Sequence, residues 1–249
     1  MELTKNKFVV YTALFGDYDD LIEPKEKFEG CDFICFTDQK SVKSDIWEIR
    51  TIDECNMSKN MMNRKFKILP HIFLGDYDLS LYIDANIAIL NNPLILANKY
   101  LSKYDIAVPK HFARNCLYKE AKECVILGKT KYRETKKQIK KYENDGFPKN
   151  FGLGENNILF RKHNSSKVVK IMNDWWNELN TQTQRDQLSF AYVLWKNNEK
   201  FNFIDESSRE KNRFFKYLNH NQYKNRNILN KLFDKIIILF KRMFYGIIF

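Results

Sequence analysis

The sequence is poor in the residues that interrupt or cross-link a chain, since its 249 residues include only eight glycines, five prolines and five cysteines. With 44% apolar and 29% charged residues, this composition excludes a collagen-like, low-complexity or disordered chain. The cysteines form no CxxC pair and the four histidines are scattered singly, which argues against a zinc finger or ribbon. No run of 18 apolar residues is present, so we expect no membrane-spanning helix. The composition predicts a globular protein large enough to contain an active-site cleft.

The chain begins MELTK, without the apolar stretch of a secretory signal. Unpaired cysteines are typical of a reducing compartment. Both observations favour a cytoplasmic location.

The net charge of +11 is unevenly distributed. Residues 209–249 hold ten Lys or Arg against two Asp or Glu, a net +8, whereas residues 1–208 carry +3. A smaller excess lies at 129–141, where seven basic residues accompany one acid. A nucleic-acid-binding function is therefore not expected, because the excess is concentrated in an apolar-rich tail and no helix-turn-helix, RRM or KH signature is present.

Short β-forming runs and a helical pattern alternate over the first hundred residues. The β-forming runs are 7–14, 31–37, 46–52 and 79–83, and the helical pattern covers 57–69 before Pro70. This alternation predicts an α/β fold with an open, mostly parallel sheet. Ligands bind at the carboxyl ends of such strands, and the polar residues found there are Thr12, Asp17, Asp38 and Asp84.

The second half of the chain is less regular. We expect strands at 106–109 and 157–160, helices at 166–179 and 186–195, and a helix or ordered loop at 129–143. No flexible linker separates the two halves, which predicts one continuous fold.

The end of the fourth β-forming run, Tyr82-Ile83-Asp84-Ala85-Asn86, places a carboxylate and an amide two residues apart. Such a pair can hold a divalent cation and, through it, the diphosphate of a nucleotide. The alternative is that Asp84 and Asn86 simply end a strand in a turn.

Four segments in this order resemble the TOD/MUCI-type glycosyltransferase-like family of bacterial polysaccharide loci and plants. They are VYTALFGDYD (10–19), CFTD (35–38), RKFKILPH (64–71) with SLYIDAN (80–86), and RDQLSF (185–190). The resemblance implies a GT-A-like single domain over 1–220, with a Rossmann-like nucleotide-sugar half at about 1–105 and an acceptor half at 106–220. Residues 221–249 would form a basic amphipathic tail.

The resemblance also implies a hexosyltransferase that uses a nucleoside diphosphate sugar, expected to be UDP-linked. Nucleotide-sugar binding would fall to Thr12, Ala13, Asp17, Asp38, Arg64 and Asp84. Asp84-Ala85-Asn86 is similar to the DxD motif, so Asp84, Asn86 and the late His220 would hold Mn²⁺ or Mg²⁺. Asn86 replaces the second Asp, and a neutral amide is a poorer ligand than a carboxylate, so metal dependence is a hypothesis.

Inverting transfer needs a carboxylate that removes the proton of the acceptor hydroxyl, and the resemblance makes Asp186 the candidate base. The alternative for Asp186 is a capping-box position, because Thr183 precedes it by three residues. Glu155 is the other candidate base if Asp186 proves dispensable. The residues expected to bind the acceptor are His111, Arg114, Glu155, Asn156 and Arg185. The loop 152–157 is equally compatible with an ordinary polar turn.

Residues 228–249 carry apolar side chains at helical spacing with Lys231, Lys235, Lys241 and Arg242 between them. This pattern predicts a basic amphipathic helix in 226–249 that lies on an anionic membrane surface, which would be the inner face of the plasma membrane. A helix packed on the body or on a second subunit is the alternative.

The favoured hypothesis is a membrane-peripheral glycosyltransferase acting on a surface polysaccharide, lipooligosaccharide or lipid-linked glycan. A catalytically inactive GT-A-like sugar-nucleotide-binding protein is a second hypothesis, and a basic nucleic-acid-binding protein a third. The sugar, the acceptor and the oligomeric state are not indicated by the sequence.

Overall fold

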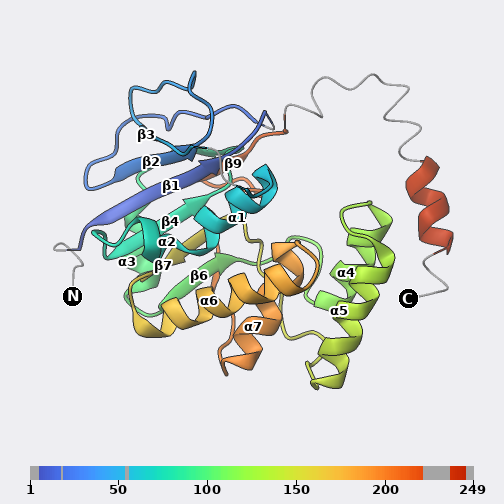
Figure 1. The fold of residues 1–249 in the computed structure, drawn as a ribbon. Helices are drawn as coiled ribbons and strands as arrows, with labels where there is room; N and C mark the ends of the chain where they lie inside the picture. Colours follow the sequence, from blue (N-terminus) through green and yellow to red (C-terminus); the bar gives the residue numbers. More distant parts are fainter. Residues whose placement is uncertain (1–5, 18, 54–55, 221–235, 245–249) are drawn as a thin grey trace.

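The computed structural model describes residues 6–17, 19–53, 56–220 and 236–244 (Figure 1). Its centre is a seven-stranded sheet in the order β3-β2-β1-β4-β7-β6-β8. The strands are β1 (Phe8–Leu14), β2 (Asp32–Thr37), β3 (Glu48–Thr51), β4 (Leu79–Ile83), β6 (Ile106–Pro109), β7 (Ile158–Arg161) and β8 (Phe203–Ile204). A small second sheet pairs β5 (Ile87–Ile89) with β9 (Phe215–Tyr217) in antiparallel fashion.

The large sheet is parallel except at one strand. β1 pairs in parallel with β2 and β4, β2 with β3, and β6 with β8. β7 lies between β4 and β6 and is antiparallel to both. The predicted α/β fold with an open, mostly parallel sheet is therefore confirmed.

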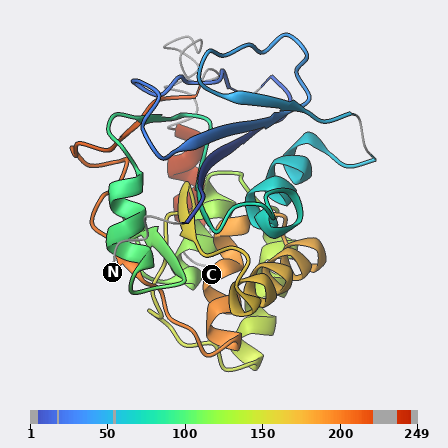
Figure 2. The same ribbon diagram turned by 90° about the vertical axis from the view of Figure 1, so that its left-hand side faces the viewer.

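The helices lie on both faces of the sheet and beside it. They are α1 (Lys59–Ile68), α2 (Pro70–Phe73), α3 (Leu94–Leu101), α4 (Leu117–Ile126), α5 (Tyr132–Asn144), α6 (Ser166–Thr181) and α7 (Phe190–Lys196), with a 3₁₀ turn η1 (Asp186–Leu188) before α7 and a further helix over 236–244. In Figure 2 the sheet lies between α3 on one side and α1 with α6 on the other. No helix in the described part of the chain has the length and apolar character needed to cross a membrane.

Strand β1 shows why this sheet is buried on both faces. Val9 and Tyr11 belong to the core that includes α1, α6 and α7, whereas Phe8 and Val10 belong to the core that includes α3. A strand with two apolar faces reads as a continuous apolar run, which is what the sequence has at this position.

A buried arginine connects the sheet to α1. The Arg161 guanidinium, at the end of β7, donates from Nη1 to the carbonyl of Lys67 (2.9 Å) and from Nη2 to the Tyr11 hydroxyl. The Tyr11 hydroxyl donates to the same carbonyl (3.0 Å). Two donors, one from β1 and one from β7 on the other side of β4, thus fix the last turn of α1.

Most predicted elements are present, and one helix start is corrected. Ser165 caps α6, as expected, by accepting a hydrogen bond from the Val168 amide. The alternative of a capping box at Thr183 is not formed, because the Thr183 hydroxyl donates to Gln138 Oε1 (2.5 Å) instead. The chain therefore forms the turn η1 at Asp186, and α7 begins at Phe190.

Candidate active site

A cleft of about 1550 Å³ opens at the carboxyl ends of the parallel strands. The cleft is lined by residues at the ends of three strands. They are Ala13–Gly16 at the end of β1, Asp84–Asn86 after β4 and His111 after β6. This is the edge at which ligands bind in open α/β sheets. The fold therefore brings the predicted nucleotide-side and acceptor-side segments into one cavity.

Lys67 lies between the two aspartates of the cleft. Its Nζ is 2.7 Å from Asp186 Oδ2 and 3.4 Å from Asp84 Oδ1. Arg64, one helical turn earlier on α1, places Nη2 3.8 Å from Asp186 Oδ1. Residues three apart on a helix share a face, so α1 presents both cations to the cleft.

Asp186 is held in its charged form. Burial by itself would raise the pKa of this carboxyl, but the Lys67 ammonium and the Arg64 guanidinium hold the pKa well below its ordinary value. Both carboxylate oxygens of Asp186 face a cation. Such a carboxylate is a strong electrostatic anchor and a weak base.

The predicted metal ligands are occupied by protein groups. Asp84 Oδ1 accepts a hydrogen bond from the Tyr82 hydroxyl (2.9 Å) as well as the Lys67 contact. The Asn86 amide donates from Nδ2 to the Leu218 carbonyl (2.8 Å) and lies 3.4 Å from His220 Nε2. The other ring nitrogen of His220, Nδ1, is 2.7 Å from Asp19 Oδ2.

These contacts do not fit a divalent cation. Both nitrogens of His220 face other side chains, and the amide nitrogen of Asn86, not its oxygen, is turned toward that ring. Within the described residues, no three His, Cys, Asp or Glu side chains gather as metal ligands do. Asp84, Asn86 and His220 thus all line the cleft, but Asp84 Oδ1 and both ring nitrogens of His220 already face other protein groups.

His111, one of the predicted acceptor-binding residues, is neutral and fixed. Its Nδ1 accepts hydrogen bonds from the backbone amides of Ala113 (3.2 Å) and Arg114 (3.1 Å), and its Nε2 lies 3.5 Å from Glu120 Oε2. Burial lowers the pKa of His111 to about 4. Arg114 donates to the same Glu120 carboxylate, so its charge is already paired.

Glu155 is a second buried carboxylate in the cleft. Its Oε1 accepts a hydrogen bond from Arg209 Nε (2.6 Å), and the Arg209 guanidinium lies 3.9 Å from the centre of the Tyr217 ring and 5.0 Å from that of Phe112. Burial raises the pKa of Glu155, and the Arg209 charge offsets only part of that rise. The two carboxyls Glu155 and Asp186 therefore have pKa values shifted in opposite directions.

The sequence of residues 1–220 matches the family described as TOD1/MUCI70, glycosyltransferase-like domain. The chain belongs to this family. A relative named probable hexosyltransferase MUCI70, from Arabidopsis thaliana, is 26% identical over 217 residues, which cover 74% of this chain and 36% of the relative. The chain thus spans about a third of the length of the curated relative that it matches.

Two solved structures resemble this chain in fold. The structure of the bifunctional glycosyltransferase WbbM in its apo form superposes with a TM-score of 0.51 at 9% identity, over 98% of this chain and 45% of the other. The structure of the galactosyltransferase LgtC with donor and acceptor sugar analogues has a TM-score of 0.42 at 10% identity, over 81% and 74% of the two chains. The TOD1/MUCI70 chain has a GT-A glycosyltransferase fold, as predicted.

Most residues that the sequence singled out in this TOD1/MUCI70 domain lie around the cleft. They are Ala13, Asp17, Arg64, Asp84, Asn86, His111, Arg114, Glu155, Asn156, Arg185, Asp186 and His220. Thr12 and Asp38 do not line it. Thr12 is fully buried within β1, and Asp38 braces the loop after β1 by accepting from the Gly16 amide (3.0 Å) and pairing with Lys59 Nζ (2.6 Å).

Two cations of the TOD1/MUCI70 cleft were not predicted from the sequence. Lys67 lies within the segment RKFKILPH (64–71). Its spacing of three residues from Arg64 on a predicted helix indicates that the two side chains share a helical face. Arg209 comes from an irregular stretch before β9 and reaches Glu155 across 54 positions, for which no local pattern exists.

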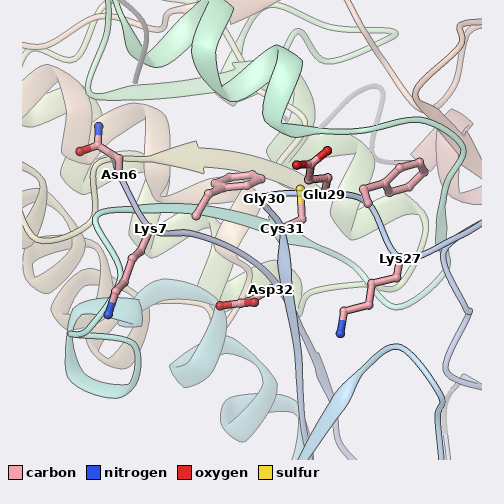
Figure 3. Close-up of a pocket in the computed structure, with 9 residues that line it drawn as sticks. Asn6, Lys7, Lys27, Glu29, Gly30, Cys31 and Asp32 are labelled. Atoms are coloured by element: carbon pink, nitrogen blue, oxygen red, sulfur yellow. The ribbon is translucent and has the colours of Figure 1, made fainter. Parts of the chain in front are cut away.

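A second, smaller hollow of about 530 Å³ lies at the amino ends of β1 and β2. Among its charged side chains, Lys7 and Lys27 extend toward one side of the hollow and Glu29 toward the opposite side (Figure 3). Burial raises the pKa of the Cys31 thiol to about 12, so this group is unreactive. The candidate site of the TOD1/MUCI70 domain is therefore the large cleft.

The described part of the tail, 236–244, is helical, as predicted; the rest of the predicted segment 226–249 lies outside the described residues. Arg242 pairs with Glu123 of α4 at 2.7 Å. Leu239, Phe240 and Met243 are 64–68% exposed. This helix thus contacts the TOD1/MUCI70 domain through a charged residue while its apolar side chains face outward.

Proposed function

We propose that this protein is a hexosyltransferase that moves a sugar from a nucleoside diphosphate sugar, UDP-linked in our proposal, to a hydroxyl group of a glycan acceptor. The family and the fold support a glycosyltransferase, and similarity to the probable hexosyltransferase of the plant supports hexosyl transfer. The observation that carries the proposal is the charge cluster Asp84–Lys67–Asp186 at the carboxyl ends of the strands.

The cluster suits a reaction in which a diphosphate leaves. Breaking the bond between the sugar and the diphosphate places negative charge on the leaving oxygen. Lys67 and Arg64 are cations fixed before the reaction by Asp186, and preorganised charges of this kind stabilise such a transition state most effectively. Asp186 then acts by holding the two cations in place.

The metal ion stays a prediction from the DxD-like motif. Mn²⁺ or Mg²⁺ would supply charge at the diphosphate if the donor drew Asp84, Asn86 and His220 together. The described contacts of these residues do not favour that arrangement, so we propose no step through a metal.

The acceptor is proposed to enter beside His111, Glu155, Asn156 and Arg185. A surface polysaccharide, lipooligosaccharide or lipid-linked glycan is the proposed class, because the helix 236–244 carries an exposed apolar face next to Lys241 and Arg242. Such a helix binds anionic membrane surfaces. We accordingly propose a peripheral position at the cytoplasmic face of the plasma membrane.

The experiment is a panel of UDP-, GDP-, TDP- and CMP-linked sugars in a thermal-shift assay, followed by product analysis with the sugars that bind. A ligand at 100 times its Kd stabilises the native state by about 2.7 kcal/mol, a readily measured shift. We expect one UDP-hexose to stabilise the protein, and the matching free hexose not to. A panel without any stabilising sugar nucleotide would contradict the proposal.

The alternative of an inactive sugar-nucleotide-binding protein is favoured by one observation, the neutral amide of Asn86 at the DxD-like position. The same panel separates the two. Saturable binding with neither transfer nor slow hydrolysis of the donor would favour the inactive protein.

A further inference from the structure

Three consecutive residues of the cleft hold side-chain oxygens that meet no hydrogen-bond donor. Glu155 Oε2, Asn156 Oδ1 and Asn157 Oδ1 are buried without a partner among the described residues. Their side chains belong to residues only 6%, 3% and 7% exposed, and all three line the cleft. Leaving a buried acceptor unpaired costs stability, so three in a row point to a ligand that supplies donors.

This segment is held between the two aspartates of the charge cluster. The carbonyl of Asn157 accepts from the Asp84 amide (2.9 Å), and Asn156 Nδ2 donates to the carbonyl of Asp186 (3.4 Å). Gln187 donates to the carbonyl of Gly154. The three unpaired oxygens are thus fixed next to the place where the diphosphate bond would break.

The buried carboxylates of Asp186 and Glu155 differ in whether they have an oxygen without a partner. Both oxygens of Asp186 face cations, whereas Glu155 uses Oε1 for Arg209 and keeps Oε2 unpaired. A general base needs an available lone pair and a pKa closer to the working pH. Opposite pKa shifts in two carboxyls of one cleft are a recurrent sign of different chemical roles.

We propose that Glu155 is the general base of the transfer. As the acceptor oxygen bonds to the anomeric carbon, its proton passes to Glu155 Oε2. The bond between the anomeric carbon and the diphosphate oxygen breaks, and its electron pair leaves with the nucleoside diphosphate beside Lys67 and Arg64. Glu155 later releases the proton to solvent. Asn156 and Asn157 accept from other hydroxyls of the acceptor, and direct displacement inverts the anomeric centre.

Arg209 is the positioning residue for this base. Its guanidinium is planar, stacks on Tyr217 and donates through Nε to Oε1, which leaves Oε2 directed elsewhere. Lysine lacks the planar group and cannot reproduce both contacts.

The test rests on the proposed function and uses the sugar nucleotide that the panel identifies. Steady-state transfer and donor-induced thermal shift are measured for the full chain and for Glu155→Gln, with Glu134→Gln as the matched control. Glu134 also lines the cleft, but its side chain is 56% exposed and pairs with Lys131. We expect Glu155→Gln to lower kcat by about 10²- to 10⁴-fold with an unchanged donor shift, and Glu134→Gln to stay within about 3-fold.

The pH profile separates a base from a structural role. In the wild type, kcat/KM should fall as the pH drops through the raised pKa of Glu155, because the base becomes protonated. This acidic limb should be absent in the residual activity of Glu155→Gln and retained, with a lower plateau, in Glu155→Asp. In Arg209→Lys the limb should move to higher pH, because the carboxylate loses its fixed guanidinium.

The outcomes are distinguishable. A wild type that transfers sugar, with Glu155→Gln equally active or with the acidic limb removed only by Asp186→Asn, would overturn Glu155 as the base and leave the proposed function standing. A retained anomeric configuration in the product would also overturn it. A wild type that no sugar nucleotide stabilises would overturn the proposed function, and the base with it.

Discussion

The ammonium of Lys67 lies 2.7 Å from Asp186 Oδ2, and both residues are more than 90% buried. Because little water reaches these two charges, each is stabilised mainly by the opposite charge beside it. Removal of one partner leaves the other buried charge with only its longer contact, to Asp84 or to Arg64, which is more costly than the loss of an exposed ion pair.

We therefore expect Asp186→Asn to lower the free energy of unfolding at pH 7 by about 3–5 kcal/mol. Urea denaturation followed by circular dichroism measures this difference. Glu48→Gln, which breaks the exposed pair with Arg50, should change it by less than about 1 kcal/mol. Equal midpoints for the two variants would contradict the expectation.

The same pair predicts a pH dependence of stability. The pKa of Asp186 is lowered on folding from its ordinary value of 3.8, so its contribution is fully present above about pH 5 and is lost as the pH falls below about 4. The difference in stability between wild type and Asp186→Asn should thus shrink progressively as the pH is lowered from 4 to 2. A constant difference across that range would show that the carboxylate charge is not responsible.

Gly154 is expected to be indispensable for the geometry of the Glu155–Asn157 segment. A Cβ at this position would lie 2.7 Å from Val108 Cγ2 and 2.8 Å from Phe201 Cε1. Gly154→Ala should destabilise the protein by about 1–3 kcal/mol and reduce transfer. Gly75→Ala is the control, since its nearest atom would be 3.9 Å away. Similar melting temperatures for both variants would argue against the close fit.

Donor binding is expected to be insensitive to chelation. Asp84 Oδ1 accepts from Tyr82, the Asn86 amide nitrogen donates to the Leu218 carbonyl, and the ring nitrogens of His220 face Asn86 and Asp19. The thermal shift caused by the identified sugar nucleotide should thus be the same in EDTA as in Mn²⁺. A shift that requires Mn²⁺ would instead support the predicted metal site and show that the donor rearranges these contacts.

The exposed apolar face of the helix 236–244 predicts binding to anionic vesicles. Leu239→Ser with Phe240→Ser should weaken co-sedimentation with phosphatidylglycerol-containing vesicles at least 10-fold, because each side chain contributes about 1.5–3 kcal/mol on burial in lipid. Ile72→Ser is the control, as Ile72 is 57% exposed on α2. Unchanged binding of the double variant would favour the alternative in which the helix packs on protein.

The sequence predicted the parts of this site that local patterns encode. Arg64 was named only through the family resemblance, whereas Asp84 was located because a strand of apolar residues ends there. Asp38 was placed on the same argument, yet it turns to Lys59 and the Gly16 amide, since a strand end fixes the position of a residue and not the direction of its side chain.

Long-range partners were beyond such patterns. Glu155 was predicted to bind the acceptor. What distinguishes its carboxyl from that of Asp186 is the cation beside each, which is Arg209 for Glu155 and Lys67 for Asp186. The reversed direction of β7 is likewise invisible in its sequence, because a buried strand of four residues has the same composition in either orientation.

The reversed strand β7 sets the order in which the molecule can be assembled. During synthesis, residues 1–105 supply β1 to β4 and α1, but the edge of β4 is unpaired until β7 emerges, and the carbonyl of Lys67 lacks the Arg161 guanidinium. β5 cannot pair until β9, which is later in the chain than β7, has been synthesised. Such distant pairings form slowly and together. The charge cluster joins Lys67 and Asp84 from the first half of the chain to Asp186 from the second, so it can be complete only after both halves have been synthesised and paired.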